Sequence, residues 1–190
     1  MHSQCLGQGG NMAVSLHKFT VQEAANAVLP RLIEVDATTT TANYDENDVI
    51  FNWVEVPNVT RTTGGAVQLV SASALLPAAM GDRKAKIQLV FAQGIGSTGT
   101  EPAALGTLDS AVSISRADAQ AGQICGTCVI GGGEDDLVAS NIASNATENL
   151  GLIMAPESAS KSLWVAGIAR AEPAAAFTDT VIKLYLGFYG

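Results

Sequence analysis

Charged side chains are scarce in this sequence. Asp, Glu, Lys and Arg make up 15% of the 190 residues, whereas typical soluble domains contain roughly 25%. The charges are mostly acidic, with 10 Lys and Arg against 18 Asp and Glu and a formal net charge of −8. Nucleic acids bind basic surfaces that replace phosphate counterions, and anionic membrane surfaces attract basic segments. We therefore expect neither nucleic acid nor a membrane as a partner.

Long hydrophobic runs and targeting signals are also missing. No apolar run approaches the ~20 residues of a membrane-spanning helix, and residues 1–11 lack the basic and apolar regions of a secretion signal. The three cysteines, Cys5, Cys125 and Cys128, are an odd number, which favours reduced thiols over a disulfide framework. These features predict synthesis in a cytoplasm.

Groups suited to catalysis are few. The two histidines, His2 and His17, lie near the N-terminus, and no G-x-S-x-G sequence is present, so no nucleophile with its base can be identified. A carboxylate pair could serve as acid and base, but no spacing marks one. We predict that the protein is not an enzyme and needs no cofactor.

Aromatic residues make up only 5% of the chain, although apolar residues reach 47%. A chain of 190 residues can form one domain with a real core, whereas two would be cramped. So few charges leave apolar surface for partners to cover. We therefore expect self-association as a homotrimer, with a contribution from the aromatic side chains near the C-terminus, Tyr185, Phe188 and Tyr189.

What the sequence does contain is a series of β-type segments separated by turns rich in Gly, Thr, Ser, Asn and Pro. They span residues 31–36, 48–56, 66–75, 86–92, 124–130, 150–155, 162–170 and 180–189. Several alternate apolar and polar residues, as a sheet with one buried face requires. They predict an all-β fold, a β-sandwich or a jelly-roll-like domain, in which residues 48–56 and 66–75 form a wide hairpin. The last segment places Ile182, Leu184, Leu186 and Phe188 on one face, which we expect to be buried.

One or two short helices accompany the strands. Thr20 and Glu23 have the spacing of a capping box, and residues 115–122 resemble a single capped turn that ends at a glycine. Residues 1–15, rich in Gly and Gln, predict a flexible N-terminal arm. A single β-rich domain is expected from residue 16 to residue 190.

Two short motifs imitate binding sites. Residues 94–99, GIGSTG, match the glycine pattern of dinucleotide sites, but no crossover helix follows them, so we favour a turn. Cys125 and Cys128 have the spacing of a redox pair or of half a zinc site. The segment around them is β-type and further zinc ligands are few, so we favour thiols that fill small spaces in the interior.

Acidic clusters and tryptophans were the remaining candidates. Residues 45–48 (DEND) and 134–136 (EDD) are rich in carboxylates but lack the spacing of a calcium loop, and we favour solvated loop charge. Trp53 and Trp164 lie within β-type segments, where they are expected to anchor a core or an interface rather than bind a ligand.

The order of several segments resembles that of a family of small tailed-phage virion proteins. The matching stretches are 66–71 (AVQLVS), 85–91 (AKIQLVF), 108–119 (LDSAVSISRADA), 123–130 (QICGTCVI), 163–173 (LWVAGIARAEP) and 181–188 (VIKLYLGF). The resemblance covers roughly residues 48–190. It implies a decoration (cement) protein on the capsid surface of the virion, made in the host cytoplasm, with the major capsid protein as its partner. The family has no catalytic residues to carry over.

Two other functions remain open from the sequence. The chain could be a neck, tail or fibre component of the virion. It could also be a calcium-dependent carbohydrate-binding or lyase-like β module that uses Glu134, Asp135 and Asp136.

Attachment to the capsid is expected to involve the N-terminal region, because a flexible arm can become ordered on binding. The residues that we expect to contact the partner are Leu6, Met12, Leu16, His17 and Phe19.

Overall fold

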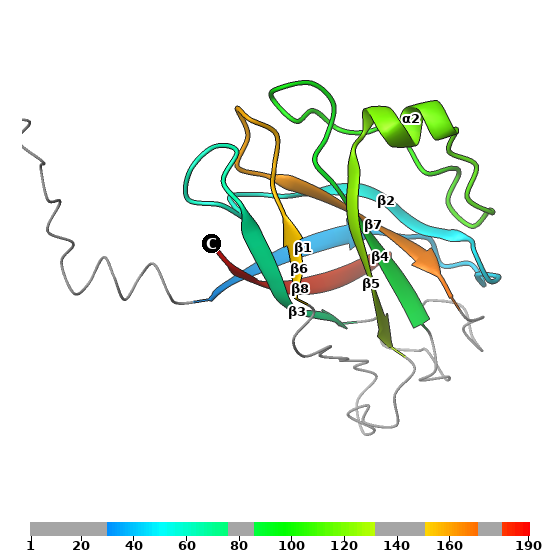
Figure 1. Cartoon of the computed structure of the whole chain (residues 1–190). Helices are drawn as coiled ribbons and strands as arrows, with labels where there is room; N and C mark the ends of the chain where they lie inside the picture. Colours follow the sequence, from blue (N-terminus) through cyan, green and yellow to red (C-terminus); the bar gives the residue numbers. More distant parts are fainter. Residues whose placement is uncertain (1–29, 76–85, 132–150, 171–179) are drawn as a thin grey trace, which may run out of the picture.

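The computed structural model describes residues 30–75, 86–131, 151–170 and 180–190 (Figure 1). These residues form eight strands and one short helix. The strands are β1 (Arg31–Thr38), β2 (Val49–Val56), β3 (Val67–Leu75), β4 (Lys86–Ala92), β5 (Ile124–Gly131), β6 (Leu152–Met154), β7 (Leu163–Ala169) and β8 (Val181–Tyr189), and the helix is α2 (Arg116–Ala121). The all-β class that the sequence predicts is thereby confirmed.

The strands pair as a long antiparallel ribbon that has been rolled up. β1 pairs with β8, β2 with β7, β3 with β6 and β4 with β5, each in antiparallel orientation. Two more antiparallel pairings, β3 with β8 and β4 with β7, join the ribbon into two four-stranded sheets. The first sheet has the order β1-β8-β3-β6 and the second the order β2-β7-β4-β5. This arrangement is an eight-stranded jelly roll.

The expected hairpin between residues 48–56 and 66–75 is wrong. β2 belongs to the second sheet and β3 to the first, so the chain between them crosses from one sheet to the other. The crossing is fixed by backbone hydrogen bonds to the β6–β7 connection, from the Thr60 amide to the Lys161 carbonyl and from the Gly64 amide to the Ser160 carbonyl. Alternation of apolar residues identifies the buried face of a strand but not the strand it pairs with. The pairing of residues 48–56 with 66–75 was therefore predicted wrongly.

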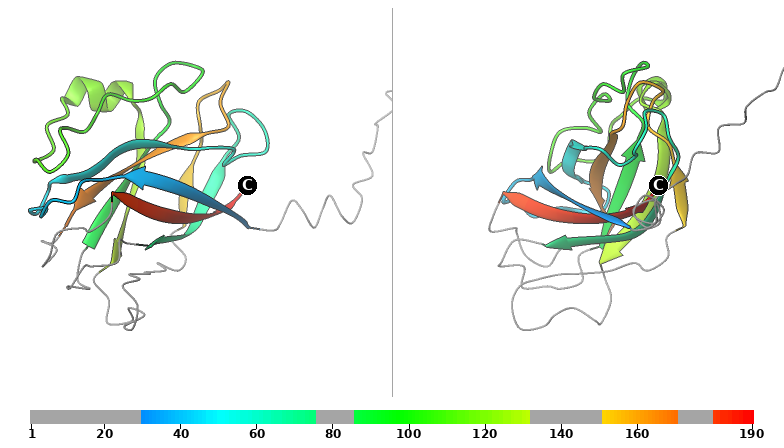
Figure 2. Two further views of the ribbon diagram at one scale, coloured as in Figure 1. Left: turned by 180° about the vertical axis from the view of Figure 1, so that it is seen from behind. Right: turned by 90° about the vertical axis from the view of Figure 1, so that its left-hand side faces the viewer.

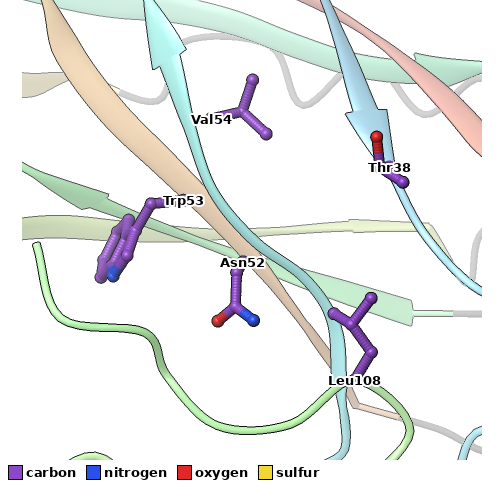
Figure 3. A pocket seen from close by; sticks show the side chains of 5 residues that line it. All are labelled: Thr38, Asn52, Trp53, Val54 and Leu108. Carbon is purple, nitrogen blue, oxygen red and sulfur yellow. The ribbon is translucent and has the colours of Figure 1, made fainter. Parts of the chain in front are cut away.

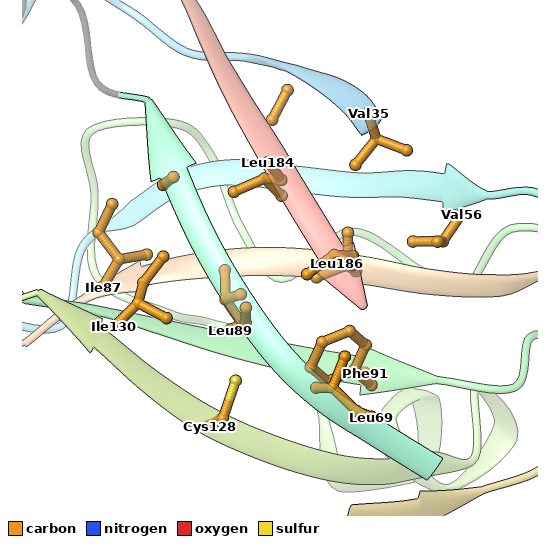
Figure 4. Close-up of a cluster of buried hydrophobic side chains, with 14 of the residues drawn as sticks. Val35, Val56, Leu69, Ile87, Leu89, Phe91, Cys128, Ile130, Leu184 and Leu186 are labelled. Atoms are coloured by element: carbon orange, nitrogen blue, oxygen red, sulfur yellow. The ribbon is translucent and has the colours of Figure 1, made fainter. Parts of the chain in front are cut away.

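The main core lies between the two sheets (Figure 4). The four residues expected on the buried face of the last strand, Ile182, Leu184, Leu186 and Phe188, have no solvent exposure. Burial of each such side chain contributes roughly 1.5–3 kcal/mol. β8 lies between β1 and β3, so these side chains occupy the middle of the core. The same burial corrects the expected role of Phe188 in self-association, because its ring is not at the surface.

A segment between β4 and α2, residues 93–114, covers the outer face of the second sheet; we call it the covering segment (Figure 1). It contributes Leu105, Leu108, Val112 and Ile114 to a second hydrophobic cluster. The sheet contributes the outward-facing residues Val49, Trp53, Val90, Ala92, Trp164, Ala166 and Ile168. Because the covering segment buries the outer face of the second sheet, five successive residues of β7, from Val165 to Ala169, are buried. A strand with one solvent-exposed face would instead alternate buried and exposed residues.

Helix α2 follows the covering segment and agrees with the capped turn that the sequence predicts. The Ser115 hydroxyl accepts a hydrogen bond from the Asp118 amide at 3.1 Å, and Gly122 ends the helix. The residue in left-handed conformation is the next one, Gln123, with φ of 51°. The helix expected near Thr20 and the arm of residues 1–15 lie outside the described residues. No helix among the described residues is long and apolar enough to cross a membrane.

Candidate functional site

The residues expected to contact a partner lie outside the part of the chain that the structure describes. This applies to Leu6, Met12, Leu16, His17 and Phe19. It also applies to the acidic residues Glu134, Asp135 and Asp136 that a calcium site would need. The functional surfaces considered next are therefore those of the jelly roll itself.

The acidic cluster of residues 45–48 is a turn at the start of β2. Asp45 and Glu46 are exposed, in agreement with solvated loop charge. Asp48 corrects that expectation, because it is buried and its carboxylate accepts a hydrogen bond from the Asp45 amide at 2.8 Å. The carboxylate thus holds the turn. Within the described ranges, no three His, Cys, Asp or Glu side chains are grouped to hold a metal ion.

The thiols of Cys125 and Cys128 pack against the main core as free cysteines. Cys125 is the extra residue of a bulge, because Phe91 pairs with Gly126 and Ala92 with Ile124, and the bulge lets thiols three residues apart both approach the core. Burial raises the pKa of Cys125 to about 11 and that of Cys128 to about 12. Reactive thiols have lowered pKa values, so the geometry agrees with thiols that fill space.

The glycine motif of residues 94–99 is a tight turn, as expected. The Ile95 amide donates to the Thr100 carbonyl at 2.8 Å, and the Thr100 amide donates back to the Ile95 carbonyl at 3.0 Å. Gly94 has φ of 104°, and a side chain there would lie 2.6 Å from the Gly99 backbone. The first glycine is therefore required by backbone geometry, and the motif serves the fold.

Three polar side chains of the second sheet hold the covering segment. Asn52 donates to the Gly106 carbonyl and accepts from the Leu105 amide, both at 2.9 Å. The indole Nε1 of Trp53 donates to the Ala103 carbonyl at 2.8 Å, and that of Trp164 donates to the Gly99 carbonyl at 2.9 Å. Both tryptophans are thus core anchors, as the sequence suggested. Their polar atoms are used within the chain.

A small open cleft lies beside this anchor, at the end of β1. It has a volume of about 230 Å³ and is lined by Thr38, Asn52, Trp53, Val54 and Leu108 (Figure 3). Ligand pockets typically measure roughly 300–1,000 Å³ and offer convergent polar groups. Here the amide of Asn52 and the indole N–H of Trp53 already bond to the covering segment. The cleft is too small and too poor in available polar groups to support a ligand site.

The outer face of the first sheet, on the side of β1, β8 and β3 away from the second sheet, is called the open face (Figure 2). In the right-hand view β1, β8 and β3 form one layer below the strands of the second sheet. Strand alternation and register place on it Leu32, Glu34, Asp36, Thr38, Gln68, Ser71, Ser73, Leu75, Ile153, Val181, Lys183, Tyr185 and Tyr189. No described segment covers this face as residues 93–114 cover the other.

Large apolar side chains stand exposed on the open face. Leu32 is 69% exposed, Ile153 is 71% exposed and Tyr189 is 40% exposed. Leu32 on β1 is opposite Gly187 on β8, and Tyr189 is the next residue of β8 on the same face. Tyr189 and Ile153 are both opposite Gln68 of β3, one on each side of it. The three apolar side chains therefore lie near one end of the sheet, where β1 begins and β8 ends.

The charges of the open face form one cluster at its other end. The Lys183 ammonium lies 2.6 Å from a Glu34 carboxylate oxygen and 3.1 Å from one of Asp36. Hydrogen bonding to Glu34 and then to Asp36 raises the pKa of Lys183. One cation beside two anions leaves a net charge of −1. All three side chains are substantially exposed, so the cluster contributes little to stability.

Sequence reasoning missed two parts of this arrangement. The sequence analysis gives residues 93–114 no part in a core, although the spacing of Leu105, Leu108, Val112 and Ile114 gives them an apolar side. Tyr44 lies between two predicted strands and outside both, yet it is buried and its hydroxyl hydrogen-bonds to the Thr39 hydroxyl at 2.6 Å. The sequence gives little indication of the open face. One sign is Leu32, which is apolar although the other outward-facing residues of β1 are polar.

Neither a family model nor a curated protein matches the sequence. Among solved structures, the chain is similar to a chain described as "Israeli acute paralysis virus heated to 63 degree - full particle". The TM-score is 0.37 and the identity is 9%, over 100% of this chain and 81% of the other. A likeness at that TM-score carries no argument, so the jelly-roll assignment rests on the strand pairing.

Proposed function

We propose that this chain is a structural protein of a virion, and specifically a decoration protein that binds between major capsid subunits on the outside of a tailed-phage shell. In this role it stabilises the shell by bridging subunits and performs no catalysis. The virion is then its location, and the host cytoplasm its place of synthesis.

The observation that carries the proposal is that polar side chains of this jelly roll are bonded within the chain, whereas one sheet face is left uncovered by described residues. The polar groups of Asn52, Trp53, Trp164 and Asp48 are used to hold the chain to itself. Among the residues that the structure describes, the open face is a surface that no other described segment covers, and its charged side chains are Glu34, Asp36 and Lys183. Jelly rolls are common in viral capsids, although lectins and cupins share the fold. The sequence resemblance to tailed-phage virion proteins favours the capsid among these.

Binding at many equivalent sites suits such a surface. A protein that contacts a lattice in many copies gains effective concentration from each neighbour, so moderate contacts suffice. The N-terminal residues proposed to contact the capsid lie between Leu6 and Phe19, ahead of Pro30, the residue that precedes β1. These residues would form a second contact with the capsid, in addition to the contact made by the jelly roll.

Self-association, expected as a homotrimer, belongs to the same proposal. Its basis is the low charge of the chain, together with exposed apolar residues such as Ile124 (41%) and Val129 (46%) on β5. Phe188 no longer contributes, because it is buried. Sedimentation of the isolated protein tests this part, and a monomer at high micromolar concentration contradicts it.

Addition of the protein to purified shells that lack it tests the proposal directly. We expect saturable binding at many sites per shell and a rise in the temperature at which the shell disassembles. A protein that binds only at one vertex or to tails would instead be a neck, tail or fibre component. A protein that binds no part of the particle would contradict a virion role, and a calcium titration with carbohydrate ligands would then address the remaining alternative.

A further inference from the structure

We infer that the open face of the first sheet is the surface through which the jelly roll docks on a subunit of the virion shell, and that the docked subunit presents an apolar surface with a basic side chain. This inference rests on the proposed function and names the partner surface that function requires.

The first observation is the difference between the two outer faces of the sandwich. The second sheet is covered by the chain itself, with Asn52, Trp53 and Trp164 bonded to the covering segment. The first sheet has no such cover among the described residues, although Leu32 and Ile153 are each about 70% exposed. The two side chains lie on the opposite edge strands β1 and β6, with Tyr189 of β8 between them, and exposed apolar groups spread across one uncovered sheet face are a feature of interaction sites.

The second observation is the size of the face. β1, β8 and β3 contain 8, 9 and 9 residues, so the three strands and β6 span roughly 30 Å by 15 Å. Because β6 has only three residues, the full width is reached at one end, and the face supplies at most about half of the ~800 Å² that each partner contributes to a standard protein interface; neighbouring residues would supply the rest. The aromatic side chains of Tyr185 and Tyr189 on β8 are of a type enriched at such interfaces.

The third observation is the charge of the face, which decides between a second copy and a different partner. The cluster of Lys183, Glu34 and Asp36 has a net charge of −1, with Asp36 more exposed than Lys183. Two copies packed face to face would bring two such surplus charges into one interface, which disfavours self-docking. A partner with Arg or Lys opposite Asp36 would neutralise the surplus, and Arg is enriched in interface cores.

The assignment is compatible with the proposed N-terminal contacts but does not rest on them. Leu32 is the second residue of β1, and residues 1–29 join that strand through Pro30. Residues in that segment are the ones proposed to contact the shell. Docking through the open face brings the start of β1 against the same partner that the N-terminal residues bind.

The experiment compares variants for binding to expanded shells assembled from the major capsid protein of the virus that encodes this chain. The test variant carries Leu32→Glu and Ile153→Glu, two changes at exposed positions. The control carries Ile95→Glu, in the turn that follows β4 of the other sheet, at an apolar position that is 37% exposed and has no proposed binding role. Carboxylates forced into an apolar contact are costly, so we expect the double variant to bind at least tenfold more weakly and the control to bind like the wild type.

The other outcomes are distinguishable. If the wild type does not bind the shells, the proposed function fails. If the wild type and the double variant bind equally, only the assignment of the face fails. Loss of self-association with unchanged shell binding assigns the face to a second copy, and a large fall in melting temperature assigns it to a segment of the same chain; either result overturns the inference. Asp36→Asn tests the charge: we expect several-fold weaker binding at low salt and convergence with the wild type at high salt.

Discussion

The ring of Phe51 on β2 occupies the space in which a side chain at position 167 on β7 would lie. The two residues are paired across the second sheet, and a Cβ added to Gly167 would fall 2.1 Å from Cε1 of that ring. Phe51 is fully buried in the main core. The absence of a side chain at residue 167 is therefore a condition for the packing of the ring, and the pair lies between the two register irregularities of the β2–β7 ladder.

Gly167→Ala should destabilise the protein by roughly 1–3 kcal/mol, the usual cost of overpacking a core. The ring cannot move far because the core surrounds it. A matched control is Gly126→Ala, whose added methyl would meet the side chain of Leu152, 2.5 Å from Cδ2 and 3.0 Å from Cγ; Leu152 is only partly buried, so its side chain has more room to move than the ring of Phe51. Denaturant unfolding compares the two. Equal losses for both variants would show that the ring is not confined.

Asn52→Ala should release the covering segment. The substitution leaves the Leu105 amide and the Gly106 carbonyl without the partners they have at 2.9 Å; because both bonds are part-buried, we expect a cost toward the lower end of the roughly 1–3 kcal/mol found for buried groups. Hydrogen exchange provides the specific readout, because the Leu105 amide should lose protection. Gln68→Ala, at an exposed position of β3, serves as the control. Unchanged protection of the Leu105 amide would refute the anchoring role.

Stability should decline above about pH 9 because of the two thiols. Burial raises the pKa of Cys125 to about 11 and that of Cys128 to about 12, from an ordinary value of 9.0. Between these values the unfolded chain loses thiol protons that the folded chain retains, so the contribution is intact below pH 9 and is lost as pH rises toward 11–12. From pH 9 to 10 we expect a loss of roughly 1 kcal/mol for each thiol.

The variant with Cys125→Ala and Cys128→Ala isolates this effect from tyrosines and lysines that titrate in the same range. Its free energy of unfolding should fall less steeply between pH 9 and 10 than that of the wild type. Parallel curves for the two proteins would mean that the thiols ionise in the folded state.

Deletion of residues 181–190 should abolish cooperative unfolding. β8 pairs with both β1 and β3, and four of its side chains have no solvent exposure, so its loss opens the core and separates the remaining strands of the first sheet. A chain that begins at Leu16 is the comparison, and we expect it to fold with an unchanged melting temperature but to bind shells more weakly. A cooperative melting transition in the chain without residues 181–190 would contradict the central place of β8.

The sequence predicts individual strands better than their partners. The alternation in residues 180–189 identifies the buried face of β8 correctly, because that face depends only on the period of a strand. The pairing of β1 with β8 joins Arg31 to Phe188, residues far apart in the chain, and no local pattern encodes it. The hairpin error between β2 and β3 has the same origin.

Recognition of a site was limited in a similar way. Chemical motifs such as Cys125 with Cys128 are visible in a sequence and can be weighed against packing. The open face is visible only after β1, β8, β3 and β6 are aligned, since its exposed residues, such as Leu32 and Ile153, come from distant segments. Asp48 is a different case. Its place in an acidic run suggested an exposed charge, but its carboxylate is buried and accepts a hydrogen bond from the Asp45 amide.

The measurement that tests the proposed function most directly is quantitative mass spectrometry of purified, intact virus particles. A decoration protein occupies equivalent positions over the whole shell, so this chain should be present at a copy number comparable to that of the major capsid protein. A few copies per particle would place it in a neck, tail or fibre, and its absence from the particle would contradict a structural role in the virion.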